Sequence, residues 1–344
     1  MLLTFILAQV LITGCSADTL GRKVVFTTGF SDNEVFRIED VSCSLTETMV
    51  YLVNMQNGYE ATFGSEIWRQ QTDSGTVEDR LKESVLAKVA QIKVMNLLAS
   101  ENGIELDESE LEKAKSAAEE YYETLSDSDK EAMNNVTVSD LAQIMAEQAL
   151  ANKLYDYIIR DINPEISDDE ARTITVEQIF VKTYNLDQSG NKVPFEEKDK
   201  ARAHDRIREA FIKLMNGGDF DEVLEQYNEA DEGTISFGKG EMDSAYETAA
   251  FNLGTDEVSG IVETRDGYVI IKCISTFNRE ETETNKVKIM EQRKREVFGK
   301  EYDAFVETLT KELNSKLWDR VSLMTDSDAT SSNLMDIYHK YFDN

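Results

Sequence analysis

The sequence predicts an α+β protein: a helical module built from the N- and C-terminal segments, with an inserted domain in which helices surround a small antiparallel sheet. Long stretches at both ends repeat apolar residues with the 3.6-residue period of buried helices. The middle of the chain alternates short β-branched runs with glycine-rich turns. A chain of 344 residues is also long for one core, so two domains are expected.

The composition is strongly acidic. Lys and Arg total 36 against 67 Asp and Glu, which gives a formal net charge of −31. Such a surface repels phosphate backbones, so nucleic-acid binding is not expected. The same charge favours solubility and can attract cationic unfolded segments. The two histidines, His204 and His339, lack metal-ligand spacing, so we expect no metal and no cofactor.

The first residues have the composition of an export signal. Residues 1–13 are almost entirely apolar, yet they are fewer than the ~20 residues that span a bilayer. They fit the hydrophobic region of a secretory signal, although no basic residue precedes Arg22. The run ends in Leu-Ile-Thr-Gly-Cys, which resembles a bacterial lipobox. We therefore expect a signal peptide over residues 1–14, lipid attachment at Cys15 and an extracytoplasmic location on the bacterial cell membrane.

Residues 15–170 form the predicted N-terminal helical module. A β-prone stretch, Val35–Ile38, precedes helices expected over residues 45–57, 76–100, from 108 onward, and 139–161. Asn102-Gly103 should end the second of these helices. Leu111 belongs to the face of the third that is predicted to point inward. Such apolar stripes usually form core, and a Met-, Tyr- and Leu-rich face left open could also hold unfolded chains.

Residues 171–276 form the predicted inserted domain. Thr173–Val181 is β-branched and alternating, so it should be the first strand. A polar loop over residues 182–193 leads to a helix over 195–216, which Gly217-Gly218 ends. A glycine-rich turn at 237–242 then opens a short helix. Residues 254–273 form a hairpin, with Asp-Gly in its turn at 264–267.

The chain returns to helix after this domain. The stretch 277–323 carries an apolar stripe that includes Val287 and Val297, and it should be one helix, or two broken near Gly299. We expect it to pack on the N-terminal module, since the small inserted domain cannot cover it. Residues 324–344 are predicted to be a flexible tail with an amphipathic end. Cys43 and Cys273 lie in apolar surroundings, which favours two buried thiols over a disulfide.

Five short elements of the inserted domain occur in a recognisable order. They are G-x-D-F from Gly217, F-G-K-G-x-M from Phe237, A-A-F-x-L, E-V-S and D-G-Y-x-I-I-K. This order resembles the parvulin family of peptidyl-prolyl cis-trans isomerases over Thr173–Ser275. The flanking helices resemble those of PrsA-like and SurA-like extracytoplasmic foldases. The resemblance implies an apolar pocket for a proline ring and polar groups that favour the twisted amide.

This sequence matches the apolar pocket residues of that family better than it matches the family's polar active-site residues. The resemblance implies substrate binding by Met242, Tyr246 (where phenylalanine is usual), Phe251 and Phe237. The family's histidine on the first strand is replaced by Gln178, and that on the last strand by Val269. Gln178 and Asp231 are then the candidate catalytic residues, although Glu229 or Asn228 could replace Asp231.

The predicted function is a membrane-anchored foldase that isomerises prolyl bonds in secreted proteins. Both family histidines are absent, so the activity should be weak, or lost in favour of binding alone. The alternative is a non-catalytic holdase chaperone whose degenerate parvulin domain only binds extended clients, and a third reading is an anchored scaffold for one partner. Expected partners are unfolded or partly folded secreted polypeptides and the membrane, with a homodimer as an alternative to the monomer.

Overall fold

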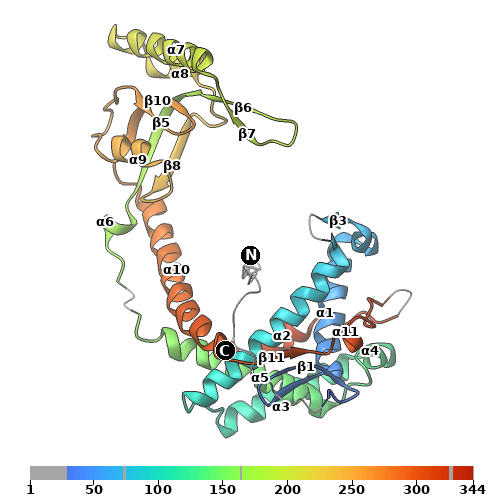
Figure 1. The fold of residues 1–344 in the computed structure, drawn as a ribbon. Helices are drawn as coiled ribbons and strands as arrows, with labels where there is room; N and C mark the ends of the chain where they lie inside the picture. Colours follow the sequence, from blue (N-terminus) through green and yellow to red (C-terminus); the bar gives the residue numbers. More distant parts are fainter. Residues whose placement is uncertain (1–28, 73–74, 163–164, 325–327, 344) are drawn as a thin grey trace. The chain divides into compact units, whose positions relative to one another are not determined.

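The computed structural model describes residues 29–72, 75–162, 165–324 and 328–343 (Figure 1). The predicted signal peptide and Cys15 lie outside these ranges. The chain divides into two compact units. The first comprises residues up to Lys93, Lys115–Ile144 and Thr310–Asn344, and the second comprises Val94–Ala114 and Met145–Leu309. Both ends of the chain thus build the first unit, and the predicted α+β class with an inserted sheet domain is confirmed.

Most of the first unit is helical. Its longer helices are α1 (Leu45–Phe63) and parts of α2 (Val77–Glu101), α3 (Glu108–Thr124) and α5 (Val138–Ile159), each of which fits a predicted helix to within a few residues, except that α1 runs longer. The sequence analysis missed α4 (Asp127–Ala132), which begins with a capping box between Ser126 and Asp129. Other short elements are the 3₁₀ helix η1 (Ser65–Arg69) and the strands β3 (Gln71–Thr72) and β4 (Gly75–Thr76).

A three-stranded antiparallel sheet joins the two ends of the chain within the first unit. Its order is β11–β1–β2, with β1 at Glu34–Ile38, β2 at Val41–Ser44 and β11 at Lys311–Leu313. Phe36 pairs with Cys43 on one side and with Leu313 on the other. The prediction of helix through residue 323 is therefore wrong, because strand pairing with β1 overrides the helical periodicity from residue 311 onward. The four-residue helix α11 (Ser315–Trp318) follows, capped by the Asn314 side chain.

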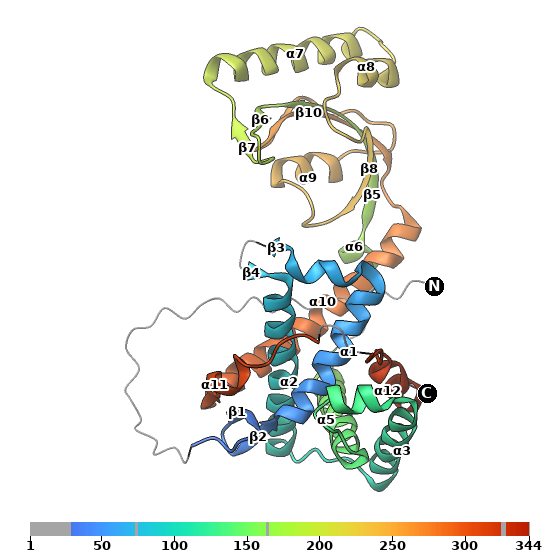
Figure 2. The ribbon, with the colours of Figure 1, turned by 90° about the vertical axis from the view of Figure 1, so that its right-hand side faces the viewer.

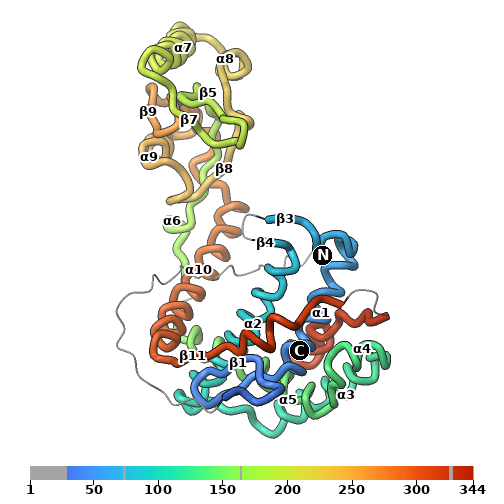
Figure 3. The backbone as a smooth tube through the Cα atoms, turned by 45° about the vertical axis from the view of Figure 1, so that its right-hand side comes forward, coloured from blue at the N-terminus to red at the C-terminus, as the bar shows by residue number. Residues whose placement is uncertain are grey.

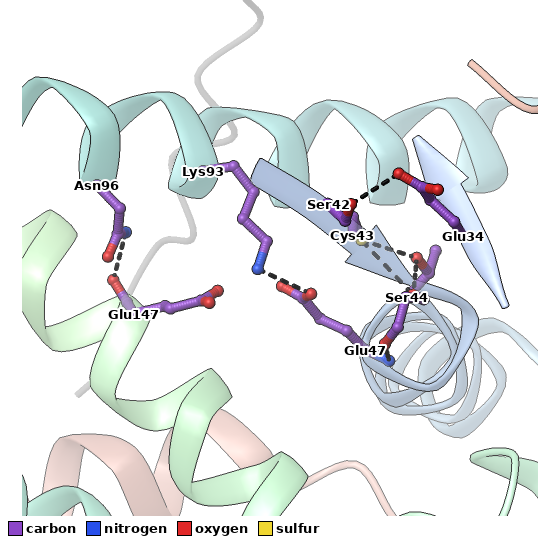
Figure 4. A network of polar contacts seen from close by, with 9 residues as sticks. Glu34, Ser42, Cys43, Ser44, Glu47, Lys93, Asn96 and Glu147 are labelled. Carbon is purple, nitrogen blue, oxygen red and sulfur yellow. Dashed lines mark hydrogen bonds and ion pairs between the residues drawn. The ribbon is translucent and has the colours of Figure 1, made fainter. Parts of the chain in front are cut away.

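A buried ion pair links α1 and α2 in the first unit. Figure 4 shows the Lys93 ammonium pointing at the Glu47 carboxylate, 2.9 Å away, with both side chains withdrawn from solvent. The Cys43 thiol lies nearby, 3.3 Å from the Thr48 hydroxyl. Burial raises the pKa of Cys43 well above its ordinary value. Cys43 and Cys273 are both buried and free, as predicted.

The C-terminal tail is ordered where the structure describes it. Ala329 and Ser331 are buried, and α12 (Leu334–Phe342) buries Leu334 among others. Figure 3 shows this end of the chain beside α1 and α4. The prediction of a flexible tail is therefore wrong for residues 328–343, because its polar backbone finds hydrogen-bond partners that composition does not reveal.

The second unit is built on a four-stranded antiparallel sheet. Its order is β8–β5–β10–β9, with β5 at Thr173–Lys182, β8 at Thr234–Gly238, β9 at Val262–Glu263 and β10 at Gly267–Ser275. Helices α7 (Glu197–Met215) and α8 (Phe220–Tyr227) cover one face of the sheet, and α9 (Ser244–Phe251) covers the other (Figure 2). The predicted polar loop after β5 is a hairpin of β6 (Tyr184–Leu186) and β7 (Lys192–Pro194).

Helix α10 (Arg279–Val306) continues unbroken through Gly299 and belongs to the second unit. It packs near its start on β5, β8 and the short helix α6 (Asp168–Ala171). Buried Asn285 donates to the Ala171 carbonyl there, at 3.0 Å. The predicted burial of Val287 and Val297 is wrong, since they are 63% and 41% exposed, and Leu111 of α3 is 50% exposed. The polar residues Thr282 and Asn285 carry the packing at the start of α10. Further along, Phe298 of the apolar stripe contacts Tyr155 of α5, with ring centroids 5.1 Å apart, in line with the predicted packing on the N-terminal helices.

Glu34 organises the start of the three-stranded sheet. Its carboxylate accepts two hydrogen bonds from Arg37 and one from the Ser42 hydroxyl, each at 2.7 Å. The backbone N–H of Ser31 donates a further bond of 3.1 Å. Although burial opposes ionisation, the Arg37 bonds dominate and lower the pKa of Glu34 to about 2. The ionised carboxylate therefore stabilises this unit.

We expect Glu34→Gln to lower the free energy of unfolding at pH 7 by about 1–3 kcal/mol, because charge-assisted bonds are lost. The folded pKa of Glu34 is depressed from 4.5 to about 2. Its contribution is therefore complete above the unfolded pKa and is lost as the pH falls toward the folded one. Urea denaturation should show a smaller gap between wild type and variant at pH 3 than at pH 7. Glu66→Gln, at an 85% exposed side chain, is the matched control, and an equal gap at both pH values would contradict the assignment.

Candidate functional site

The pairing of β5 with β10 decides which side chains face α9. In register, Ile271 pairs with Gln178 and Val269 with Phe180. Successive residues of a strand point to opposite faces, so Gln178 and Phe180 share the face of Val176. On the opposite face, Ile179 packs in the core under α7 and α8. The face toward α9 therefore carries one buried amide among apolar side chains.

A cleft of about 530 Å³ opens on this face. It is lined by the two β5 residues, by the segment that begins α9 and by the turn between β9 and β10. The lining residues are Gln178, Phe180, Ala230, Glu241, Met242, Asp243, Tyr246, Thr264, Arg265 and Asp266. The structure thus brings together three predicted site residues, Gln178, Met242 and Tyr246.

Gln178 and Tyr246 are bonded to each other in the wall of the cleft. The Tyr246 hydroxyl donates to Oε1 of Gln178 at 3.1 Å, and Nε2 of Gln178 donates to the Glu232 carbonyl at 3.1 Å. Gln178 is 8% exposed and Tyr246 is 3% exposed. Burial raises the pKa of Tyr246 well above its ordinary value, so its hydroxyl stays protonated. The amide is consequently held in one orientation by its neighbours.

An aromatic cluster supports the cleft from behind. The ring of Phe237 lies 5.5 Å from that of Tyr246 and 5.8 Å from that of Phe251, both in edge-to-face geometry. Phe237 is buried in the core between the sheet and α9, and Phe251 packs against that core. Neither lines the cleft. These two predicted substrate-binding residues therefore support Tyr246 rather than face a ligand.

Asp231 is exposed and is not among the residues that line the cleft. The neighbouring candidates, Asn228 and Glu229, accept hydrogen bonds from the backbone of β5. Oδ1 of Asn228 accepts from the backbone N–H of Phe180 at 2.9 Å, and Oε2 of Glu229 accepts from that of Lys182 at 2.9 Å. These bonds hold the loop along the edge of β5. Val269, at the second histidine position, is fully buried, so it offers the cleft no polar group.

Sequence reasoning missed Phe180 and the rim of the cleft. Phe180 could have been found from the two-residue period, because it lies two positions after Gln178 on the first strand. At the rim, Asp266 binds the Lys192 ammonium of β7 at 2.5 Å. This contact joins the β6–β7 hairpin to the β9–β10 turn across 74 residues of sequence, and no local pattern reveals it.

Gly267 makes room for Phe180. A Cβ added at Gly267 would lie 2.2 Å from the Val181 carbonyl oxygen and 2.8 Å from Cζ of Phe180. Both distances are far below van der Waals contact, and the carbonyl belongs to a paired strand that cannot move freely. The phenyl ring therefore keeps its place at the cleft because position 267 has no side chain.

Comparison with known families fits this geometry. Residues 179–275 match the rotamase family described as the PPIC-type PPIase domain. The chain contains a parvulin-type rotamase domain. The matched residues begin within β5 and end with β10, so they include most of the four-stranded sheet and all of its covering helices. The cleft described above lies on the α9 face of this rotamase domain.

The similarity extends to proteins named as foldases. Over 215 residues the chain is 26% identical to foldase protein PrsA 1 of Listeria monocytogenes serotype 4b, covering 59% of this chain and 67% of that protein. Over 257 residues it is 25% identical to foldase protein PrsA of Caldanaerobacter subterraneus subsp. tengcongensis, covering 71% and 74%. For PrsA of Halalkalibacterium halodurans the match is 25% identical and spans 58% of that protein.

Solved structures show more distant likenesses. A PrsA peptidylprolyl isomerase from Bacillus cereus aligns with a TM-score of 0.36 and 18% identity, covering 80% of this chain and 98% of that one. A structure of SurA-like chaperones from Campylobacter jejuni aligns with a TM-score of 0.28 and 11% identity, covering 82% and 99%.

Within residues 29–72, 75–162, 165–324 and 328–343, no group of three or more metal-ligating side chains converges. Over the same ranges, no helix combines the length and apolarity needed to cross a bilayer. The polar side chains that line the cleft are the Gln178 amide, the Tyr246 phenol, the Thr264 hydroxyl and the charged groups of the rim.

We expect Gly267→Ala to lower the free energy of unfolding by about 1–3 kcal/mol, because the new methyl group overpacks the β5–β10 pair. It should also weaken binding of proline peptides, since Phe180 must move. Urea denaturation would measure the first effect, and fluorescence anisotropy of a labelled peptide would measure the second. Gly260→Ala is the matched control, because an added Cβ there meets nothing within 4 Å. Equal stability of the two variants would contradict the packing argument.

Proposed function

We propose that this chain is an extracytoplasmic foldase whose rotamase domain accelerates cis–trans isomerisation of X-Pro bonds in unfolded secreted polypeptides. The observation that carries the proposal is the cleft in which Met242, Phe180 and Tyr246 surround the buried amide of Gln178. Similarity to proteins named PrsA foldases supports the choice of clients and compartment. We further propose that a lipid on Cys15 anchors the protein to the membrane.

The chemistry requires no nucleophile and no metal. An X-Pro bond exchanges in tens to hundreds of seconds, because its partial double bond sets a barrier of ~18–20 kcal/mol. An apolar cleft disfavours the charge-separated resonance form that keeps the amide planar. Met242 and Phe180 would receive the pyrrolidine ring. Gln178 then lies where its remaining N–H can donate to the amide as it twists.

Met242→Ala should lower kcat/KM for a proline tetrapeptide about tenfold or more, because the prolyl ring loses apolar contact. A protease-coupled assay at several enzyme concentrations would measure this. Met215→Ala is the control, since Met215 is 62% exposed on α7 and outside the cleft. If wild type, folded by circular dichroism, does not exceed the uncatalysed rate, the enzymatic proposal fails.

Tyr246→Phe tests whether the amide must be held in place. The substitution keeps the aromatic wall and removes the hydroxyl that donates to Gln178. We expect kcat to fall several-fold while KM stays near its wild-type value, because the ring contacts with substrate persist. A loss of stability of about 1 kcal/mol should accompany it. A rise in KM with unchanged kcat would instead assign the hydroxyl to substrate binding.

The absence of both family histidines from the cleft favours a second function. Gln178 is engaged on both sides by the protein, and Val269 cannot form a hydrogen bond. A domain with these features can bind extended segments without isomerising them, which is the activity of a holdase. Suppression of aggregation that survives Met242→Ala, together with a rate at the uncatalysed level, would favour this function over the first.

The anchor proposal has its own test. Cys15→Ser should release the protein from the membrane fraction of a bacterial host and abolish labelling by a fatty-acid analogue. Cys273→Ser, at a buried thiol of the sheet, is the control and should leave labelling intact. Labelling that persists in Cys15→Ser would reject Cys15 as the attachment site.

A further inference from the structure

The C-terminal tail, residues 328–343, is held against the first unit by main-chain hydrogen bonds and by buried side chains of α12. Four side chains of α1, α3 and α4 contact the tail, and Gln56 of α1 contacts Met324 just before it. Together they form what we name the tail-binding surface: Asn54, Gln56, Asn57, Tyr121 and Asp129. The tail runs beside α1 and α4 (Figure 3). It has no regular secondary structure over residues 328–333 and is helical over Leu334–Phe342. This is the arrangement of a peptide laid along a receptor.

Most hydrogen bonds between this surface and the tail go to backbone groups, and one joins the Tyr121 and Ser331 hydroxyls at 2.8 Å. Oδ1 of Asp129 accepts from the N–H groups of Thr330 and Ser331, at 2.8 and 2.9 Å. Nδ2 of Asn57 donates to the Ser331 carbonyl at 2.9 Å. Oδ1 of Asn54 accepts from the N–H of Leu334 at 3.1 Å. Contacts of this type depend little on the identity of the bound side chains.

Gln56 makes a two-point contact just before the tail. Its Nε2 donates to the Met324 carbonyl at 2.7 Å, and its Oε1 accepts from the Met324 N–H at 3.1 Å. A side-chain amide that binds both groups of one residue holds an extended backbone as a neighbouring strand would. Main-chain bonds of this kind supply affinity in the binding of extended peptides, while pockets supply selectivity.

The burial pattern of the tail shows what side chains the surface accepts. Ala329 and Ser331 are buried, whereas Thr330 and Ser332 are exposed. Beyond them, Leu334, Ile337 and Tyr338 bury one face of α12. The surface therefore takes an extended stretch with small residues at alternate positions, followed by an amphipathic helical turn.

The polar groups of the surface are covered and bonded by the chain's own C-terminal segment. Asn54, Gln56 and Asp129 are 8%, 2% and 3% exposed with the tail in place. The C-terminal segment bonds to these groups where it covers them, which avoids the cost of about 1–3 kcal/mol for each polar group buried without a partner. All the strands that the structure describes precede residue 328, so release of the tail breaks no strand pair among them. Its last charged contact, Lys340 with Glu120, is on the surface and contributes little.

We propose that the tail-binding surface is a second polypeptide-binding site, which takes an extended segment of an unfolded client and which the chain's own tail occupies at rest. The nature of the client rests on the proposed foldase function. The site itself does not, because it belongs to the first unit and uses none of the residues of the rotamase cleft. The tail then acts as a built-in competitor that limits access to this site.

The test uses the full chain with Ile337→Asp, which places a charge on the buried face of α12 and leaves the tail-binding surface unchanged. The probe is a labelled synthetic peptide of residues 328–343, measured by fluorescence anisotropy. We expect the variant to bind it at least tenfold more tightly than wild type. Unlabelled peptide should compete for binding to the variant with reduced, carboxymethylated lactalbumin, which is a permanently unfolded chain. Asp336→Asn, at an exposed position of the same helix, is the control and should behave as wild type.

Two further arms separate the outcomes. A peptide N-methylated at Thr330 and Ser331 lacks the donors to Asp129 and should bind at least tenfold more weakly, and Asn57→Ala in the variant should also weaken binding. Equal binding of the peptide by wild type and variant would overturn the proposal, as would loss of the native circular dichroism in Ile337→Asp, because the tail would then be core. Peptide binding without lactalbumin competition would overturn the client class alone. Tetrapeptide isomerisation reports independently on the rotamase cleft.

Discussion

The antiparallel pairing of β5 with β10 is the constraint on which the cleft depends. Because strand side chains alternate between faces, a shift of this register by one residue would bury Ile179 in the cleft and turn Gln178 toward α7 and α8. The close backbone approach at Gly267 and a bulge near Cys273 mark the two ends of this pairing. The β5–β10 register therefore decides which side chains reach the cleft, and the chemistry proposed for the rotamase domain depends on it.

The cleft and the tail-binding surface present different chemical groups to a bound polypeptide. The cleft presents apolar side chains and one oriented amide, which suits a single ring and its peptide bond. The surface of the first unit presents amides and a carboxylate to successive main-chain groups, which suits a stretch of several residues. A foldase needs both kinds of contact, since a slow isomerisation is useful only while the surrounding segment is kept extended.

Sequence periodicity predicted the helices and strands that are set by the local pattern of apolar residues. It failed where contacts with residues far away in the sequence determine the structure. The helices α1, α2, α3, α5 and α7 and the strands β5 and β10 follow from apolar spacing and turn residues. Residues 311–313 looked helical and are a strand, because β1 offers them an edge. The tail looked unstructured because small polar residues predict disorder unless their main-chain partners, such as Asp129, are known. In the cleft, family motifs located Met242 and Tyr246, while only the fold separated lining residues from the supporting Phe237 and Phe251.

The two buried thiols give each unit an internal reporter. Cys43 lies in the first unit and Cys273 in the second, and both are free and shielded from solvent. A thiol that reagents cannot reach reacts only when its surroundings open. The alkylation rate of each cysteine, resolved by mass spectrometry of the digested protein, would thus give the opening free energy of its own unit under native conditions. Such a measurement distinguishes one cooperative molecule from two units that unfold separately, without any added label.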